Sequence, residues 1–283
     1  MQLANHGGPR GKRVLPYLRP ISARTHLVAK HHENRRRAES FGEEAERYDR
    51  ARPSYPAALV DELLASKPAR VLDVGCGTGK VARLFLARGC DVLGVEPDSR
   101  MAGVARSHGI PVEVAPFEAW DPAHRMFDLV VSGQAWHWVD PSLGAQRAAS
   151  VLVPGGRLAI FWNRGQHDAP TQAALNEVYV RFAPGLAKES VPPGKWRSDR
   201  SDDIAAITAT HLFAPCQFRT YGWAQRHSRD EWLDQLGTHS DHIALEPQQR
   251  AALLDAIGTA IDRLGGSITL HYETELISAQ RTA

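Results

Sequence analysis

A run of alternating glycines is the most informative feature of the chain. The segment 71–79 reads VLDVGCGTG, and its glycines follow a short apolar run at Gly75, Gly77 and Gly79. Glycine lets the backbone turn sharply and leaves room for a ligand against bare main chain. Asp73 stands just before this loop, and Glu96 lies 21 residues after Gly75. The spacing predicts a loop that holds a nucleotide-like ligand between two carboxylates.

The chemistry around the loop narrows the choice of ligand. The spacing GxGxG is one residue shorter than the dinucleotide fingerprint GxGxxG, and Asp73 would repel a pyrophosphate, so this carboxylate suits a cationic ligand. A phosphate-binding P-loop is excluded, because Val74 stands where that motif needs glycine and Val81 where it needs Ser or Thr. Glu96 ends the next predicted strand, where a carboxylate can accept both hydroxyls of a ribose.

These residues resemble motif I of the class I S-adenosylmethionine-dependent methyltransferases. The resemblance covers roughly residues 40–275 and is closest to the small-molecule subgroup near trans-aconitate methyltransferase. It is carried by the lid-like segment 41–56, by GVEPD at 94–98 with Met101, by QAWHW at 134–138, and by VPGG at 153–156 with Trp162 and Asn163.

The resemblance implies S-adenosylmethionine as methyl donor and S-adenosylhomocysteine as product, with no metal. Asp73 would reach the amino group of the donor, Glu96 would hold its ribose, and Pro97 would pack on its adenine. The implied cofactor residues are Asp73, Gly75, Cys76, Gly77, Gly79, Glu96, Pro97, Met101, Phe117, Glu118, Gln134 and Arg52. The sequence departs from the family after the third strand, where Pro116-Phe117 replaces a common Asp-Ala pair.

His137 and Tyr48 are the residues expected at the reacting centre. His137 follows the fourth predicted strand and could act as a base if the acceptor must lose a proton, whereas a carboxylate acceptor needs none. The expected walls of the acceptor pocket are Trp136, Trp138, Trp162, Asn163 and Tyr55. A structural role for His137, core packing by Met101 and Phe117, and ordinary lid packing by Tyr48 and Arg52 remain open alternatives.

The positioning elements follow from alternating short apolar runs and helical stretches, which predict a doubly wound α/β core. We expect strands at 70–74, 91–95, 111–114, 127–131, 156–162, 216–224 and 267–273. Helices are expected at 78–88, 98–107, 141–152, 228–236 and 247–264. The resemblance implies a Rossmann-like, mostly parallel seven-stranded sheet in the order 3-2-1-4-5-7-6.

Charge and composition divide the chain. Residues 1–37 carry nine Lys or Arg against one acid, Glu33, whereas the whole chain has a net charge of +2. We expect a disordered basic extension at 1–37 and one domain at 38–283, with a lid at 38–66 and a helical insertion at 163–213 that caps the acceptor site. The three cysteines, Cys76, Cys90 and Cys216, show no CxxC spacing for zinc, and no apolar stretch suits a membrane span, so a cytoplasmic location is expected.

The expected function is O-methylation of a carboxylate or another small or lipid-like acceptor by a monomer or homodimer. Two alternatives stay open: methylation of RNA guided by the basic tail, and binding of S-adenosylmethionine without catalysis. The acidic balance of the chain after the tail disfavours nucleic acid, whose binding needs cations against phosphates. A nicotinamide-dependent dehydrogenase is disfavoured by the glycine spacing.

Overall fold

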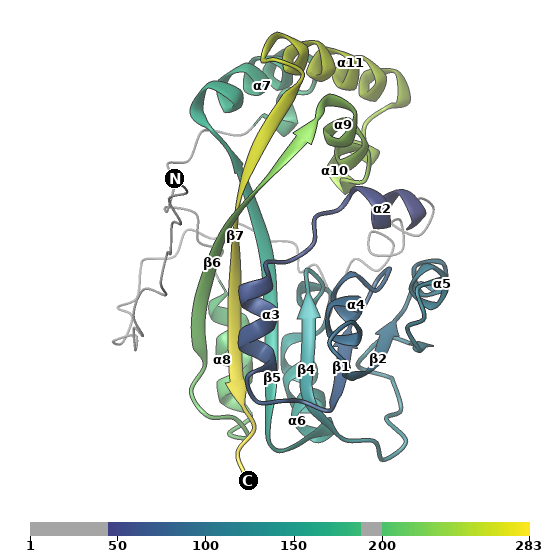
Figure 1. The fold of residues 1–283 in the computed structure, drawn as a ribbon, viewed down its shortest axis with the longest axis vertical. Coiled ribbons are helices and arrows are strands. Elements are labelled where there is room, and N and C mark those ends of the chain that lie inside the picture. The colour runs from purple at the N-terminus through teal and green to yellow at the C-terminus, as the bar shows by residue number, and fades with distance from the viewer. Residues whose placement is uncertain (1–44, 188–199) are drawn as a thin grey trace, which may run out of the picture.

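A seven-stranded sheet organises the chain (Figure 1). The computed structural model describes residues 45–187 and 200–283, and within them the strand order is β3-β2-β1-β4-β5-β7-β6. The strands are β1 (Arg70–Val74), β2 (Asp91–Glu96), β3 (Val112–Val114), β4 (Phe127–Gly133), β5 (Leu152–His167), β6 (Gln217–Ser228) and β7 (Ser267–Gln280). Neighbouring strands in the part of the sheet from β3 across to β5 are parallel, and β7 runs antiparallel to both β5 and β6. The expected Rossmann-like fold and its strand order are confirmed.

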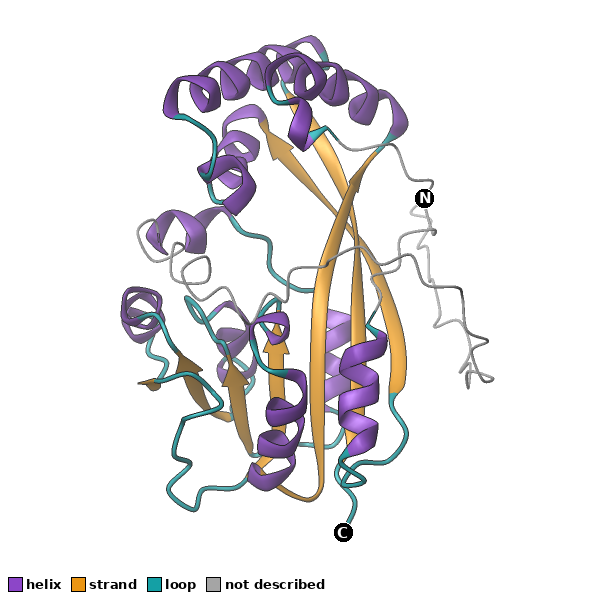
Figure 2. Cartoon of the chain, turned by 180° about the vertical axis from the view of Figure 1, so that it is seen from behind, coloured by secondary structure: helices purple, strands orange, loops and turns teal. Residues whose placement is uncertain are grey.

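Helices cover both faces of the parallel strands, as Figure 2 shows from behind. The α-helices of the described residues are α2 (Ala45–Ala51), α3 (Ala57–Leu64), α4 (Lys80–Leu86), α5 (Ser99–Ser107), α6 (Pro141–Val151), α7 (Ala169–Phe182), α8 (Ser201–Ala209), α9 (Arg229–Gly237), α10 (Ser240–Ile243) and α11 (Pro247–Arg263). One core packs α3, α4 and α5 on the sheet, and the other packs α6 and α8 on the opposite face.

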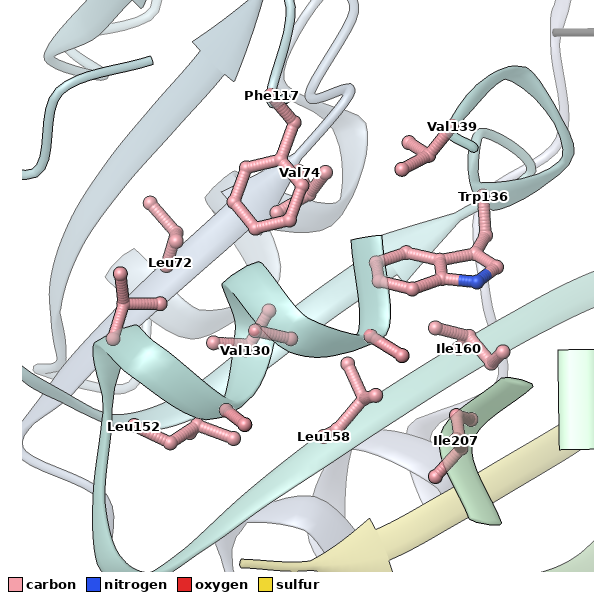
Figure 3. Close-up of a cluster of buried hydrophobic side chains, with 14 of the residues drawn as sticks. Leu72, Val74, Phe117, Val130, Trp136, Val139, Leu152, Leu158, Ile160 and Ile207 are labelled. Carbon is pink, nitrogen blue, oxygen red and sulfur yellow. The ribbon is translucent and has the colours of Figure 1, made fainter. Parts of the chain in front are cut away.

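Strand β1 shows why both faces are covered. Its neighbours Val71 and Leu72 are both fully buried, yet they belong to different cores because successive side chains of a strand point to opposite faces. Figure 3 shows the core that contains Leu72, where Trp136 and Ile207 pack with aliphatic side chains of β4 and β5. Burial on both faces explains the nearly continuous apolar runs in the sequence.

A third core lies beyond the parallel part of the sheet. Strands β5, β6 and β7 continue upward in Figure 1 as a twisted ribbon and carry α7, α9 and α11 at their far end. Apolar side chains from these helices meet the distal ends of the strands, among them Leu175, Trp232, Ile257 and Leu270. We call this unit the cap. It adds a small hydrophobic core of its own to the domain.

The region 163–213 differs from the expected insertion. β5 continues to His167, because Asn163 to His167 pair with Thr274 to Leu270 of β7. Helix α7 then packs on α11 in the cap, whereas α8 returns to pack on α6. The described part of 163–213 therefore supports the cap and the sheet.

Some expectations lie outside the described residues. These are the basic extension at 1–37, the start of the lid at 38–44, and residues 188–199 of the expected insertion. Within the described ranges, no helix is long and apolar enough to cross a membrane.

Candidate functional site

The glycine loop is a tight turn between β1 and α4. Gly75, Gly77 and Gly79 all have positive φ, at 65°, 55° and 83°, a region that side chains with a Cβ avoid. A Cβ added to Gly75 would lie 2.5 Å from the Cβ of Ala135, which follows β4. The loop thus needs glycine at Gly75 both for its conformation and for its close approach to the neighbouring chain.

A cavity of about 470 Å³ opens above this loop, at the carboxyl ends of β1, β2 and β4. This is the edge where doubly wound sheets bind ligands. Most of the residues expected at the site line it: Tyr48, Arg52, Tyr55, Gly75, Cys76, Gly77, Glu96, Pro97, Met101, Phe117, Glu118, Gln134, His137, Trp138 and Asn163. The fold therefore brings together residues from segments spread over more than a hundred positions.

Four expected site residues lie elsewhere, namely Asp73, Gly79, Trp136 and Trp162. Trp136 is 1% exposed and packs in the core, so it does not form a cavity wall. Trp162 is also buried, but its indole contacts a residue of the cavity wall, as described below. Gly79 shapes the turn from beneath it. Asp73 lies fully buried behind the loop.

Asp73 is a buried carboxyl group without a geometrically good hydrogen bond among the described residues. Burial raises the pKa of Asp73 to about 8; the backbone N–H of Ala82 opposes this shift, and the negative charge of Glu96 makes a smaller contribution in the upward direction. The ionised form of such a buried carboxyl group is energetically unfavourable unless a cation binds nearby. Asp73 therefore fits a ligand that brings positive charge to the loop, such as the ammonium group of S-adenosylmethionine.

Glu96 ends β2 and faces the same cavity. Its Oε2 accepts from the backbone N–H of Gly77 at 2.9 Å, and its Oε1 accepts from the N–H of Asp98 at 3.0 Å. Burial raises the pKa of Glu96 to about 7, and these two hydrogen bonds oppose the shift. Each carboxylate oxygen keeps a further lone pair, so Glu96 can still accept hydrogen bonds from the two hydroxyls of a ribose.

The cavity lining carries charges of both signs. Its carboxylates are Glu96, the last residue of β2, and Glu118, which follows β3 and accepts a hydrogen bond from the N–H of Asp140 at 2.9 Å. The cationic lining residues are Arg52 and Lys80. The cavity therefore offers partners to both cationic and anionic parts of its ligands.

Arg52 comes from the segment after α2 that covers the cavity. Its Nη2 donates to the backbone carbonyl of Thr238 at 2.7 Å, and its guanidinium carbon lies 5.1 Å from the ring centre of Tyr48. The Nε of Arg52 is buried and lacks a hydrogen-bond partner within the described ranges. This donor fits a carboxylate, which arginine binds well.

His137 lies in a short 3₁₀ helix, Trp136–Trp138, directly after β4. The Nε1 of Trp162 donates to the Nδ1 of His137 at 3.3 Å. An indole N–H can only donate, so Nδ1 must carry a lone pair and the neutral ring carries its proton on Nε2. The structure thus selects one tautomer of His137, which can donate a hydrogen bond from Nε2.

Gln134 shows local strain at the same place. It has φ 58°, which is uncommon for a residue with a side chain, and its Nε2 donates to the carbonyl of Asn163 at 3.0 Å. The side chain of Asn163 in turn bonds to Ser54 and Thr274. Gln134 and Asn163 therefore fix the backbone of the cavity wall, and their side chains serve this framework.

Several cavity residues were not anticipated from the sequence, in particular Pro53, Thr78, Lys80 and Ser240. Lys80 directly follows the third glycine of the loop, and this position in the sequence could have predicted that it lines the cavity. Burial lowers the pKa of Lys80, and the charge of Asp49 partly offsets the shift. Ser240 comes from the cap, about 165 residues after the loop, so no local pattern could connect it to the cavity.

The fold and the cavity define a Rossmann-like class I methyltransferase whose cofactor is S-adenosylmethionine. The Methyltransferase domain family matches residues 48–180. An uncharacterised methyltransferase from Mycobacterium tuberculosis is 42% identical over 221 residues, which cover 77% of this chain and 84% of the relative. On this likeness the chain belongs to the methyltransferase family.

Two further comparisons agree with this class. A trans-aconitate 2-methyltransferase from Mycolicibacterium gilvum is 33% identical over 133 residues, which cover 46% of this chain and 50% of the relative. The solved structure of a proposed type II methyltransferase from Anaeromyxobacter dehalogenans matches with a TM-score of 0.56 at 22% identity, covering 81% of this chain and 97% of that one. The second likeness concerns the fold alone.

Proposed function

We propose that this methyltransferase acts on an oxygen of a small acceptor that carries a carboxylate. The observation that carries the proposal is the charge of the cavity. Besides the acids Glu96 and Glu118, the cavity is lined by two cations, Arg52 from the covering segment and Lys80 from the start of α4. These two cations attract an anionic acceptor and repel a protonated amine.

Relatives that methylate carboxylates support the same class of acceptor. Besides the trans-aconitate enzyme, a malonyl-[acyl-carrier protein] O-methyltransferase from Enterobacter lignolyticus is 37% identical over 108 residues, which cover 36% of this chain and 42% of the relative. A carboxylate is already ionised near neutral pH, so its methylation needs no general base. The chain would need to orient the acceptor and exclude water.

The proposed roles follow from the contacts. S-adenosylmethionine supplies the electrophilic methyl group on its sulfonium. Glu96 holds the ribose, Asp73 attracts the ammonium group by its charge from behind the glycine loop, and Arg52 binds a carboxylate through its buried Nε. His137 donates a hydrogen bond from Nε2 that orients the acceptor, while Tyr48 covers the reacting centre from α2.

The test is a product analysis with isotope-labelled S-adenosylmethionine. Purified protein is incubated with separate panels of carboxylic acids, amines and phenols, and products are analysed by mass spectrometry. We expect labelled products from carboxylic acids that release labelled methanol on mild alkaline hydrolysis, because methyl esters hydrolyse and N-methyl or aryl methyl ether groups do not. Labelled amines or phenols with unmodified acids would overturn the proposal.

A matched pair of variants tests the role of Arg52. We expect Arg52→Gln to lower kcat/KM by at least about tenfold, or about 1.4 kcal/mol, because a charged hydrogen bond to a carboxylate is lost. Arg50→Gln removes an exposed cation near the end of α2 and should change kcat/KM less than twofold. Equal effects of the two substitutions would contradict a specific role for Arg52.

A further inference from the structure

Three metal-ligating side chains converge on α10, beside the cavity. His239, Asp241 and His242 each offer one ligand atom, and these atoms all lie within 4.8 Å of one another. The Nδ1 of His242 is 2.8 Å from the Oδ1 of Asp241, a hydrogen-bond distance, so these two atoms need to part by only about 0.5 Å to bind one tetrahedral cation. The rings of His239 and His242 lie 5.6 Å apart, at 80° to each other.

The chemistry of this set matches a first-row divalent cation. Two imidazoles and one carboxylate are common ligands of zinc, and the same set with open positions binds iron or manganese. Magnesium and calcium prefer oxygen ligands alone. We propose that His239, Asp241 and His242 form a binding site for one zinc-like divalent cation at the rim of the cavity.

A second observation concerns the other nitrogen of His242. Its Nε2 lies 2.9 Å from the hydroxyl of Tyr179 on α7, and the side chain of His242 is 5% exposed. Histidines that bind metals nearly always have their second nitrogen held by a hydrogen bond, which fixes the direction of the ligating atom. A phenol hydroxyl can accept as well as donate, so Tyr179 can accept a hydrogen bond from the Nε2–H of His242 when Nδ1 binds a cation.

The main alternative is a hydrogen-bonded Asp–His pair without a metal. In that arrangement His242 donates its Nδ1 proton to Asp241, and a cation would have to displace this proton. Such a pair accounts for two of the three groups. The third group, His239, brings a ligand atom within 4.8 Å of the other two, which is near enough for one cation to bind all three after a small adjustment.

The location gives the site a consequence for the cavity. Ser240, which lies between two of the ligands in sequence, lines the cavity, and the carbonyl of Thr238 accepts the hydrogen bond from Arg52. A cation bound here would hold α10, and through Tyr179 it would connect α10 with α7. Three protein ligands leave further positions for water or for an anionic oxygen. This inference goes beyond the proposed function and does not depend on it.

The test measures metal binding directly. Protein without an affinity tag is stripped with a chelator, dialysed, and titrated with Zn²⁺, and the bound metal is counted by elemental analysis. We expect the wild type to bind one more equivalent of Zn²⁺ than His239→Gln does. Any Zn²⁺ that His239→Gln binds at this site should be bound at least tenfold more weakly. His271→Gln, which removes an exposed histidine of β7, should bind as the wild type does.

Two controls keep the outcome decisive. S-adenosylmethionine affinity verifies that each variant is folded, and His242→Gln provides a second substitution of the proposed set. With Co²⁺ as probe, a site of low coordination number gives intense visible absorption. This absorption should appear in the wild type and in His271→Gln and be lost in His239→Gln. Equal stoichiometry, affinity and Co²⁺ spectra in the wild type and His239→Gln would overturn the proposal.

Discussion

Trp162 and His137 are joined by a hydrogen bond from Nε1 of the indole to Nδ1 of the imidazole, 3.3 Å long. The guanidinium carbon of Arg200 lies over the face of the same indole, 3.7 Å from the ring centre. Trp162 is thus held in place by Arg200 while it sets the tautomer of His137. A buried tryptophan outside the cavity wall thereby influences which proton the cavity offers to an acceptor.

The first prediction separates a hydrogen-bond donor from a general base at His137. If His137 donates from Nε2, His137→Gln keeps a neutral donor and should retain turnover within about tenfold, whereas His137→Ala should lose about 100-fold. Cofactor affinity should stay within twofold in both variants, as measured by calorimetry. A glutamine variant as inactive as the alanine variant would assign a base to this position.

The same arrangement has a spectroscopic signature. Nitrogen-15 NMR of the histidine side chains should show Nδ1 of His137 unprotonated and Nε2 protonated in the wild type. Trp162→Phe removes the indole donor, so the ring should then populate both tautomers and KM for the acceptor should rise. An unchanged imidazole spectrum in Trp162→Phe would mean that Trp162 does not set the tautomer.

The second prediction concerns the glycine loop. Gly75→Ala forces a Cβ onto a residue with φ 65° and within 2.5 Å of Ala135, so the loop must shift away from its ligand. We expect the Kd for S-adenosylmethionine to rise at least tenfold. Gly89→Ala is a matched control, because Gly89 has φ 84° with no atom near the added Cβ. It should cost about 1–2 kcal/mol of stability and leave the Kd unchanged.

The third prediction follows from the two buried carboxyl groups. The pKa values of Asp73 and Glu96 are raised to about 8 and about 7 without a ligand, so both groups are largely protonated at pH 6. A cationic ligand binds their ionised forms, and hence the affinity for S-adenosylmethionine should increase as pH rises from 6 to about 7.5, below the point at which the ligand's own α-ammonium group loses its proton. Calorimetric titrations across this range measure the change, and a flat Kd would contradict it.

Stability should show the opposite dependence on pH. Because the folded chain holds these protons more tightly than the unfolded chain, the free energy of unfolding without cofactor should fall as pH rises from about 4 to about 8. Asp73→Asn removes one of the two groups and should flatten this decline, while it weakens cofactor binding at pH 8. Chemical denaturation at several pH values tests the sign.

Local sequence patterns sufficed for the parallel half of the molecule, and the reason is visible at β1. Its buried run, the glycine turn and the following helix are determined by neighbouring residues, so the loop and Glu96 could be located directly. The roles of the two neighbouring tryptophans were harder to predict. Trp136 and Trp138 look alike in sequence, but only the packing of α6 decides that Trp136 is buried in the core and Trp138 lines the cavity.

The antiparallel half could not be predicted as well, because its order comes from distant partners. The strand β5 appears to end near Trp162 by pattern alone, yet its pairing with β7 extends it to His167. Ser240 reaches the cavity only because the cap folds over it. Contacts between residues far apart in sequence leave no periodic signal in either segment.

The last prediction concerns how α2 is held over the cavity. On one side, Asp49 accepts from Arg83 at 2.6 Å and from His108 at 2.9 Å; on the other, Arg47 donates to Asp234 of α9 at 2.6 Å. Burial disfavours ionisation of Asp49, but the hydrogen bond with Thr78 and the positive charges of Arg83 and Lys80 outweigh it and lower the pKa of Asp49. The helix that carries Tyr48 therefore joins the cap to the parallel sheet.

Releasing α2 should speed the loss of cofactor. We expect Asp49→Asn to raise the dissociation rate of S-adenosylmethionine about tenfold in stopped-flow measurements, because the pair with Arg83 is two-pronged and partly buried. Asp61→Asn is the matched control, since the exposed Asp61 also faces an arginine, Arg88, at 3.7 Å. Exposed pairs contribute only about 0–1 kcal/mol, so Asp61→Asn should leave the dissociation rate unchanged. Equal rates in the two variants would mean that α2 does not retain the cofactor.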